Sequence, residues 1–316
     1  MTDPDYDQLL DEETKAFIAK TQSYYPDRGQ DPTVAEMRAD YEAMCAGFAV
    51  AYPDGLRNQD TVIANGSHSI PVRWYIPEAA AETGPLLIYF HGGGFVVGGL
   101  DSHDSICADL AHGTGLALLA VDYALAPEHP YPAALDDARD AVRYILKTQP
   151  DRHILLAGDS AGAWLAASIA QQMKQSAPRL IGQVLIYPTL GGDITAGSYL
   201  THAEAPLLSR DDIIWYGQQF FGTEQPWHRI GPLGETDFTA LPPTVIFAAA
   251  CDPLYDDGPA YAQAVTAGGG KAVCITAEGL VHGYLRGRYQ VQKIADSFAQ
   301  IIAACRALGD GVWPYR

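Results

Sequence analysis

Basic side chains are scarce in this chain. Its 316 residues include 20 lysines and arginines against 38 aspartates and glutamates, which gives a formal net charge of −18 at pH 7. A surface this acidic repels phosphate backbones, so the composition argues against a nucleic-acid partner. The same charge is expected to steer strongly anionic substrates away from the protein.

Cysteines and long apolar runs are also few. The five cysteines are scattered and form no Cys-x-x-Cys pair, which argues against a disulfide framework and against a zinc site. No run approaches the ~20 apolar residues that span a bilayer. The N-terminus, Met1 to Asp7, is acidic and has neither the basic nor the apolar segment of a secretory signal. We therefore expect a soluble cytoplasmic protein without a membrane span.

From about residue 60, short apolar runs alternate with helical patterns. We expect strands at 60–65, 72–77, 86–91, 117–122, 153–158, 183–187, 244–250 and 272–277. Helices are expected near 102–113, 132–147, 161–175, 257–268 and 290–306. This alternation is typical of a mostly parallel sheet with helices on both faces. The length suits one large α/β domain, and we expect residues 1–316 to form it.

Two helical segments, 1–55 and 190–225, interrupt this alternation. The first contains Thr33 and Glu36 at the spacing of a capping box, and the second has a helix start at Ser209. These segments either cover core as peripheral helices or form a lid over a functional site. We favour the lid, because a pocket needs walls that the edge of a sheet does not supply.

The motif Gly-Asp-Ser-Ala-Gly at 158–162 follows an apolar run and precedes a helical pattern. A strand, a sharp turn and a helix in this order expose the hydroxyl of the central Ser160 above a sheet. A serine becomes a nucleophile only when a neighbouring base activates it. Ser160 is therefore the candidate nucleophile, and the N–H of Ala161 is a candidate donor to an oxyanion.

A second glycine-rich stretch, His91-Gly92-Gly93-Gly94, follows the expected strand at 86–91. Successive glycines weaken a strand, but their N–H groups can approach a ligand closely. The alternative is a flexible turn without a role. We favour the ligand-binding loop, in which His91 braces the glycines and does not take a proton.

An acid and a base follow in the order that acyl transfer requires. Asp252 comes directly after the expected strand at 244–250, while Asp256 and Asp257 compete with it for the role of the acid. His282 lies in a loop after the last expected strand. The order Ser160, Asp252, His282 is the order of the catalytic residues in α/β-hydrolases.

These motifs resemble the hormone-sensitive-lipase-like branch of the α/β-hydrolases, the bacterial carboxylesterases with a GDSAG turn. Asp252-Pro-Leu, Val281-His-Gly and the stretch 122–136 are similar to that family as well, and the match covers roughly 70–310. The resemblance implies an α/β-hydrolase fold with an eight-stranded, mostly parallel sheet and a helical cap. It implies a triad and an oxyanion hole made of Ser160, Asp252 and His282 with Gly93, Gly94 and Ala161.

The resemblance also implies a serine carboxylesterase for short- to medium-chain esters, without a metal or an organic cofactor, and frequent dimers through the sheet edge. The same triad supports an amidase or an acyltransferase. A relative that only binds a small ligand is a further alternative, although such relatives have lost the histidine that is present here as His282. Plausible pocket walls, each of which could equally be core, are Tyr24, Tyr25, Phe48, Tyr123, Leu208, Trp215 and Leu285.

Two positions depart from the family pattern. Many relatives have glycine where this chain has Ala163, which is followed by the bulky Trp164, so helix packing behind the turn is expected to differ. Relatives often carry arginine where Ala124 stands, and we expect an ion pair near Glu128 to be missing.

Overall fold

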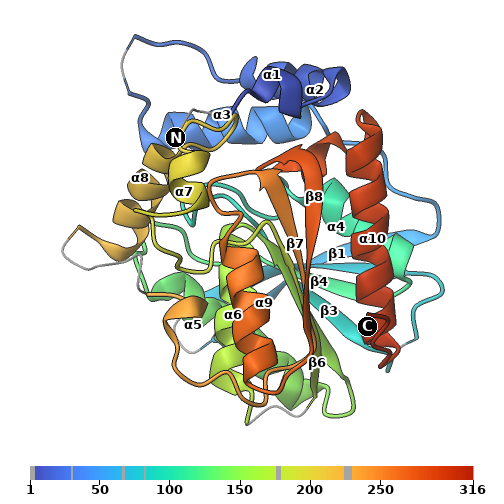
Figure 1. Ribbon diagram of the computed structural model, residues 1–316. Coiled ribbons are helices and arrows are strands. Elements are labelled where there is room, and N and C mark those ends of the chain that lie inside the picture. The colour runs from blue at the N-terminus through green and yellow to red at the C-terminus, as the bar shows by residue number, and fades with distance from the viewer. Residues whose placement is uncertain are drawn as a thin grey trace.

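An eight-stranded sheet runs through the middle of the molecule in a computed structural model (Figure 1). The structure describes residues 4–29, 31–65, 68–81, 83–175, 179–223 and 230–315. In chain order the strands are β1 (Leu56–Asn65), β2 (His68–Pro77), β3 (Leu86–Phe90), β4 (Ala117–Val121), β5 (Ile154–Asp159), β6 (Leu180–Ile186), β7 (Thr244–Cys251) and β8 (Ala272–Val281). Across the sheet the order is β1-β2-β4-β3-β5-β6-β7-β8.

The strand pairing confirms the expected α/β-hydrolase fold. β2 pairs antiparallel with β1 and with β4, and every other neighbouring pair is parallel. All eight expected strands are present. β1 starts earlier than expected because it pairs with β2 along a long hairpin, and β8 continues to Val281, next to the candidate base.

Helices cover both faces of the sheet. α4 (Asp104–Thr114) and α10 (Gln292–Gly309) pack on one face, and α5 (Ala133–Thr148), α6 (Ala161–Met173) and α9 (Asp257–Ala267) lie on the other. Every residue of β3 is therefore buried: Leu86, Ile88 and Phe90 face the α5 and α6 side, while Leu87 and Tyr89 face α4 and α10. Burial on both faces explains why the central strands are continuous apolar runs. None of the described helices is both long and apolar enough to cross a bilayer.

Five further helices lie over one end of the sheet (Figure 1) and are called the covering helices below. They are α1 (Tyr6–Leu9), α2 (Glu12–Gln22), α3 (Val34–Ala46), α7 (Ser198–Thr201) and α8 (Arg210–Phe221). Capping boxes start α3 at Thr33 and α8 at Ser209. The sequence predicts the first as a capping box and the second only as a helix start. The segments 1–55 and 190–225 contact each other through Tyr6 and His202, where Tyr6 Oη lies 2.9 Å from His202 Nδ1.

An aromatic cluster fastens α8 to the sheet domain. The rings of Phe220 and Phe95 are stacked with their centroids 3.9 Å apart, and Trp164 of α6 meets both edge-on. The departure from the family pattern at Trp164 therefore has a packing role, because its indole joins the start of α6 to a covering helix.

Arg38 fastens α3 to the segments that follow β3 and β4. Its guanidinium donates to the carbonyls of Val96 and Ala126 and pairs with Glu128, where the closest N···O distance is 2.7 Å. The expectation that Glu128 lacks an ion pair is wrong. Its partner comes from a helix 90 residues earlier in the chain, and not from position 124.

Candidate active site

Ser160 occupies a strained turn between β5 and α6. Its φ of 54° and ψ of −119° lie outside the regions that residues with a side chain normally adopt. Its N–H donates to the carbonyl of Ile186 at 2.9 Å. Because Ser160 is the N-cap of α6, its hydroxyl lies at the N-terminus of that helix. The helix dipole favours developing negative charge there.

Close backbone contacts require the two glycines of this turn. A Cβ on Gly162 would lie 1.9 Å from the carbonyl oxygen of Phe90, and one on Gly158 would lie 2.4 Å from the carbonyl carbon of Gly162. Any side chain at either position would therefore push the turn away from β3.

His282 and Asp252 reach Ser160 from the ends of β8 and β7. His282 Nε2 lies 2.9 Å from Ser160 Oγ, and His282 Nδ1 lies 2.7 Å from Asp252 Oδ2. A carboxylate can only accept, so Nδ1 carries the proton and Nε2 is left to accept from the serine hydroxyl. The other oxygen of Asp252 accepts the N–H of Leu254, and only 1% of the Asp252 surface is exposed. The structure thus places these three sequence-predicted residues in one hydrogen-bonded chain.

The two competing carboxylates bind elsewhere. Asp256 accepts the N–H of Ser198, while Asp257 accepts the N–H of Leu190 at 2.6 Å and bonds to the hydroxyl of Tyr199. Both therefore hold the segment that leads to α7. Burial raises the pKa of the Asp257 carboxyl to about 7, against its ordinary 3.8, and outweighs these hydrogen bonds.

Asp159, whose role the sequence interpretation missed, connects the turn to the glycine loop. Its carboxylate accepts from the hydroxyls of Tyr89 and Tyr187 and from the N–H of Gly92, and lies 3.3 Å from His103 Nε2. Burial raises the pKa of this carboxyl, but the charge of His103 and these hydrogen bonds outweigh burial and hold the pKa below its usual range. An acid at the end of an otherwise apolar strand is the sequence signal that could have indicated a buried polar role.

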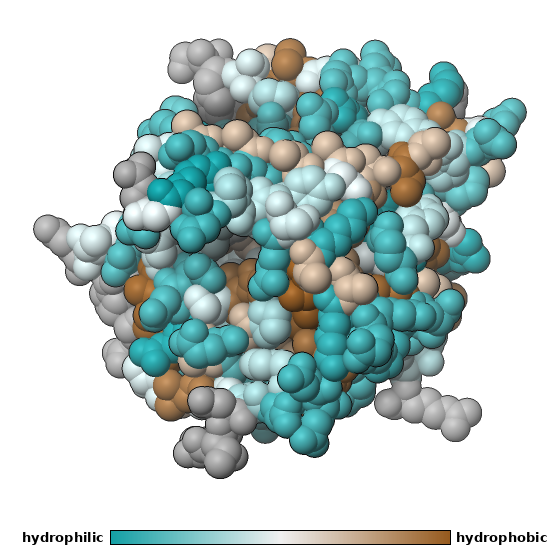
Figure 2. All heavy atoms as spheres, turned by 90° about the horizontal axis from the view of Figure 1, so that it is seen from above, coloured by the Kyte–Doolittle hydropathy of each residue, from teal (hydrophilic) through white to brown (hydrophobic). Residues whose placement is uncertain are grey.

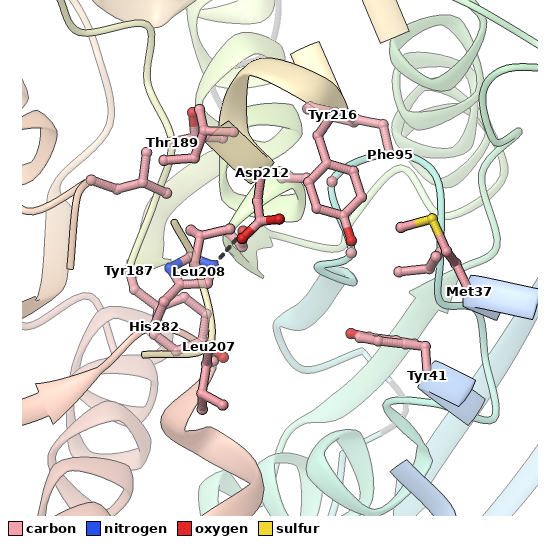
Figure 3. Close-up of a pocket in the computed structure, with 18 of the residues that line it drawn as sticks. Met37, Tyr41, Phe95, Tyr187, Thr189, Leu207, Leu208, Asp212, Tyr216 and His282 are labelled. Carbon is pink, nitrogen blue, oxygen red and sulfur yellow. Dashed lines mark hydrogen bonds between the residues drawn. The ribbon is translucent and has the colours of Figure 1, made fainter. Parts of the chain in front are cut away.

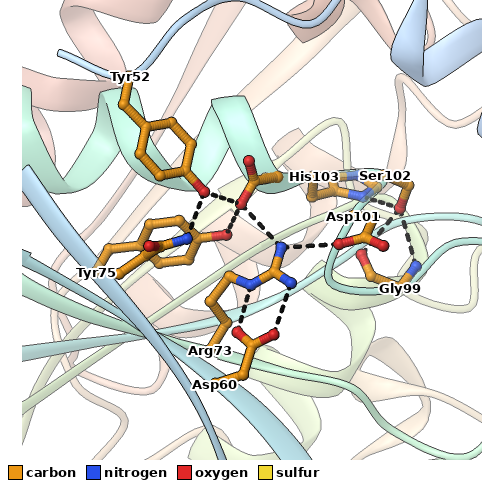
Figure 4. Close-up of polar contacts among 10 residues, drawn as sticks. Tyr52, Asp60, Arg73, Tyr75, Gly99, Asp101, Ser102 and His103 are labelled. Carbon is orange, nitrogen blue, oxygen red and sulfur yellow. Dashed lines mark hydrogen bonds and ion pairs between the residues drawn. The ribbon is translucent and has the colours of Figure 1, made fainter.

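A polar cluster at the start of α4 positions His103. Arg73 of β2 donates from one nitrogen to both Asp101 and Asp104, at 2.9 Å each, and these carboxylates flank the histidine in the chain (Figure 4). Ser102 Oγ lies 2.9 Å from His103 Nδ1. The hairpin of β1 and β2 thereby contacts the start of α4, and His103 at that start contacts the Asp159 carboxylate beside Ser160.

The glycine loop lines the same cavity as Ser160. Asp159 binds the N–H of Gly92, and the carbonyl of Gly93 accepts from two later residues of the same loop. Within the described part of the chain, the N–H groups of Gly93 and Gly94 donate to no backbone carbonyl. Both residues line the same cavity as Ser160 and Ala161. Hydrogen bonds thus hold the backbone of the loop at Gly92 and Gly93.

His91 braces this loop. Its Nδ1 lies 2.8 Å from the carbonyl oxygen of Gly92, and its ring stacks on that of Tyr123 with centroids 4.2 Å apart. Burial and the neighbouring His103 lower the pKa of His91 to about 3, so the ring is neutral at pH 7.

A cavity of about 720 Å³ opens above Ser160, between the sheet and the covering helices. This volume is in the range of small-molecule sites. In Figure 3, His282 lies on one side of the cavity and Met37 and Tyr41 of α3 lie on the other, with Tyr216 of α8 above. In Figure 2, which looks down on this end, hydrophilic residues cover most of the face and hydrophobic atoms show between them near the centre.

The expected pocket walls divide into two groups. Tyr25 and Leu208 line the cavity, whereas Phe48, Tyr123, Leu285, Trp215 and Tyr24 are absent from its lining. Phe48 packs on Phe17, and Leu285 is fully buried in the core. Walls that the sequence interpretation missed include Met37, Tyr41, Ile213, Tyr216 and Arg286. Among the described residues, no group of histidine, cysteine and acidic side chains is arranged to hold a metal ion.

Comparison with known proteins supports this geometry. A family model described as alpha/beta hydrolase fold matches residues 87–286, and carboxylesterase NlhH of Mycobacterium tuberculosis is 38% identical over 261 residues, which make up 78% of this chain and 81% of that protein. The chain belongs to the carboxylesterases of the α/β-hydrolase fold. The expected hormone-sensitive-lipase-like branch of that fold is thereby confirmed.

Other carboxylesterases and esterases match over most of the chain. Ethyl acetate hydrolase of Pseudomonas putida is 32% identical and covers 85% of this chain and 88% of its own length. The structure of a hyperthermophilic esterase from the archaeon Pyrobaculum calidifontis superimposes with a TM-score of 0.85 at 30% identity, covering 95% of this chain and 98% of that one.

We predict that Gly162→Ala misplaces Ser160. The added Cβ would meet the carbonyl of Phe90, and a displacement of about 1 Å at a nucleophile costs roughly 10²-fold in rate. Steady-state hydrolysis of p-nitrophenyl butyrate measures the effect. Gly84→Ala is the control, since Gly84 lies outside the cavity lining, has an ordinary φ, and an added Cβ would come no closer than 3.3 Å to a neighbouring residue, Ala81. Full activity of the Gly162 variant would show that the close contact is not needed.

Asp257→Asn tests the buried carboxyl that holds the segment before α7. The folded-state pKa lies above the ordinary value, so the folded protein binds the proton more tightly and loses stability as the pH rises from about 4 to about 7. Asparagine stays neutral throughout. The melting temperature of the variant relative to the parent is therefore expected to improve between pH 5 and pH 8, as thermal unfolding at both values will show. A constant difference would contradict the assignment.

Proposed function

We propose that this carboxylesterase hydrolyses short- to medium-chain carboxylic esters through an acyl-enzyme on Ser160. The observation that carries the proposal is the hydrogen-bonded chain Asp252–His282–Ser160 at the wall of a largely apolar cavity. The names of the relatives support ester hydrolysis.

In the first step, His282 accepts the proton of Ser160 as Oγ attacks the ester carbonyl. Nε2 is already placed 2.9 Å from Oγ for this transfer. Asp252 keeps the ring in the tautomer that can accept and stabilises the imidazolium that forms. The proton then passes from Nε2 to the leaving alcohol, and the acyl group stays on Oγ.

The carbonyl oxygen becomes an oxyanion during the attack, and the N–H groups of Gly93, Gly94 and Ala161 are proposed to stabilise it. All three residues line the cavity beside Ser160. Donors that are fixed before the reaction are effective because they need no reorganisation as charge develops. Water then enters, loses a proton to His282 and releases the acid, which restores the serine.

The covering helices are proposed to act as a helical cap. The cap consists of the segments 1–55 and 190–225, and it belongs to the single domain that residues 1–316 are proposed to form. Support comes from Met37 and Tyr41 of α3 and from Ile213 and Tyr216 of α8, which form walls of the cavity. The choice of substrate would then depend largely on residues of the covering helices and less on residues of the sheet.

Location and assembly stay predictions. The cytoplasmic location is proposed from the five scattered cysteines, all of which are free thiols. A homodimer is proposed through β8, which forms one edge of the sheet and whose residues Ala272 to Thr276 are only partly buried.

Ser160→Ala is expected to lower the turnover of p-nitrophenyl butyrate by roughly 10⁴- to 10⁶-fold, because the nucleophile is lost. The melting temperature should change little, since one hydroxyl is removed. Ser168→Ala, on the same helix but outside the cavity lining, is the matched control and should keep its activity. A well-folded Ser160 variant with parental turnover would exclude the proposed mechanism.

A series of p-nitrophenyl esters of increasing acyl length measures the pocket. We expect kcat/KM to be highest for short and medium chains and to fall for the longest, because the covering helices form walls that limit the length of the cavity. Tyr216→Ala should move the maximum to longer chains, since this ring packs directly over Gly94. Leu200→Ala, an exposed residue of α7, should leave the profile unchanged. The same profile in all three proteins would show that α8 does not limit the pocket.

A further inference from the structure

Arg286 places a positive charge where charge is costly. It lies in the 3-10 helix η3 (Tyr284–Tyr289), four residues after His282, and lines the same cavity as Ser160. Only 6% of its surface is exposed. A buried guanidinium needs a counter-ion or a full set of acceptors to offset the loss of hydration.

The hydrogen-bond partners of Arg286 are neutral groups of α3. Nε donates to Cys45 Sγ at 3.2 Å, and Nη2 donates to Tyr41 Oη at 2.6 Å. Burial raises the pKa of the Cys45 thiol and that of the Tyr41 phenol, so both stay protonated at pH 7. In the described part of the chain, no carboxylate pairs with Arg286. The carboxylate of Asp159, which also lines the cavity, acts on Arg286 electrostatically but forms no ion pair with it, so the guanidinium has no counter-ion in direct contact.

The neighbouring arginines show that this is unusual in the molecule. Arg288, two residues later and equally buried, pairs with Asp109 at 2.6 Å. Arg28, the other arginine of the cavity lining, pairs with Asp40 at 2.7 Å. Of these three arginines, Arg286 is the one that has no ion-paired carboxylate among the described residues.

The surroundings of Arg286 suit an anionic group of a ligand. Nη1 has no protein acceptor among the described residues, and the Tyr41 hydroxyl, which accepts from Nη2, still has its own proton to donate. Thr21 and Gln22 line the same cavity. A carboxylate placed here would receive charge-assisted hydrogen bonds and would neutralise the buried cation.

We propose that Arg286 binds a carboxylate of the substrate, so that the preferred substrates are esters whose acyl or alcohol part carries a carboxylate away from the ester bond, such as monoesters of dicarboxylic acids. This inference rests on the proposed ester hydrolysis at Ser160. The acidic surface does not oppose it strongly, because salt screens exposed charges whereas the desolvated guanidinium keeps its attraction at short range.

The test compares esters matched in length. Monoethyl esters of dicarboxylic acids from succinate to suberate carry the carboxylate in the acyl part, and ethyl esters of the corresponding monocarboxylic acids are the neutral references. Acetate esters of hydroxy acids place the carboxylate in the alcohol part. Released acid is titrated at constant pH. We expect one charged series to exceed its neutral references in kcat/KM by roughly 10- to 100-fold at its best length.

Variants assign any preference to Arg286. Arg286→Met removes the charge and keeps much of the side-chain length. In this variant the kcat/KM of charged esters should fall to that of their neutral references, while neutral esters are still hydrolysed. Lys20→Met is the matched control, because it removes one positive charge from α2 outside the cavity lining and should leave that ratio unchanged. If Arg286→Met does not fold, inhibition of the parent protein decides: free dicarboxylates should compete with p-nitrophenyl butyrate more strongly than monocarboxylates.

The outcomes separate the two proposals. Hydrolysis of neutral esters with no preference for charged ones, and no stronger inhibition by dicarboxylates, would overturn the role of Arg286 and leave the proposed function intact. A preference that survives in Arg286→Met would overturn it equally. Hydrolysis of no ester at all would overturn the proposed function and this inference with it.

Discussion

The backbone reversal at Ser160 is the constraint on which the site depends. A residue with a side chain holds a positive φ there because the structure around it leaves no alternative: β5 enters from a fully buried sheet, α6 leaves at once, and glycines at 158 and 162 let the turn lie against β3. Asp159, between the strand and the serine, ties this turn to the glycine loop and to the start of α4. Nucleophile and proposed oxyanion donors therefore occupy a single rigid unit.

Much of this arrangement could be predicted from local sequence. Strands that are buried on both faces appear as apolar runs, so all eight were found. The Ser160 turn is encoded within five residues, and Asp252 and His282 follow their strands directly. The parallel topology then brings these strand ends to one edge of the sheet. The proximity of Ser160, Asp252 and His282 could therefore be predicted from the order of the strands, without knowing how the helices pack.

The cavity walls could not be predicted in the same way. They depend on how α3 and α8 pack over the sheet, through contacts such as Arg38 with Glu128 and Phe220 with Phe95. These pairs join residues far apart in the chain, and their side chains have no local pattern. Phe48 and Leu285 were plausible walls by composition, yet they pack into the core. The neutral partners of Arg286 come from α3, 241 and 245 residues away.

In the proposed mechanism, His282 activates the hydroxyl of Ser160 and that of no other serine. Mass spectrometry of the protein after reaction with a fluorophosphonate tests this most directly, since the reagent forms a stable adduct only on an activated serine. We expect one adduct per chain, on the peptide that contains Ser160, and almost none in His282→Ala. An adduct on another serine, or undiminished labelling without the histidine, would contradict it.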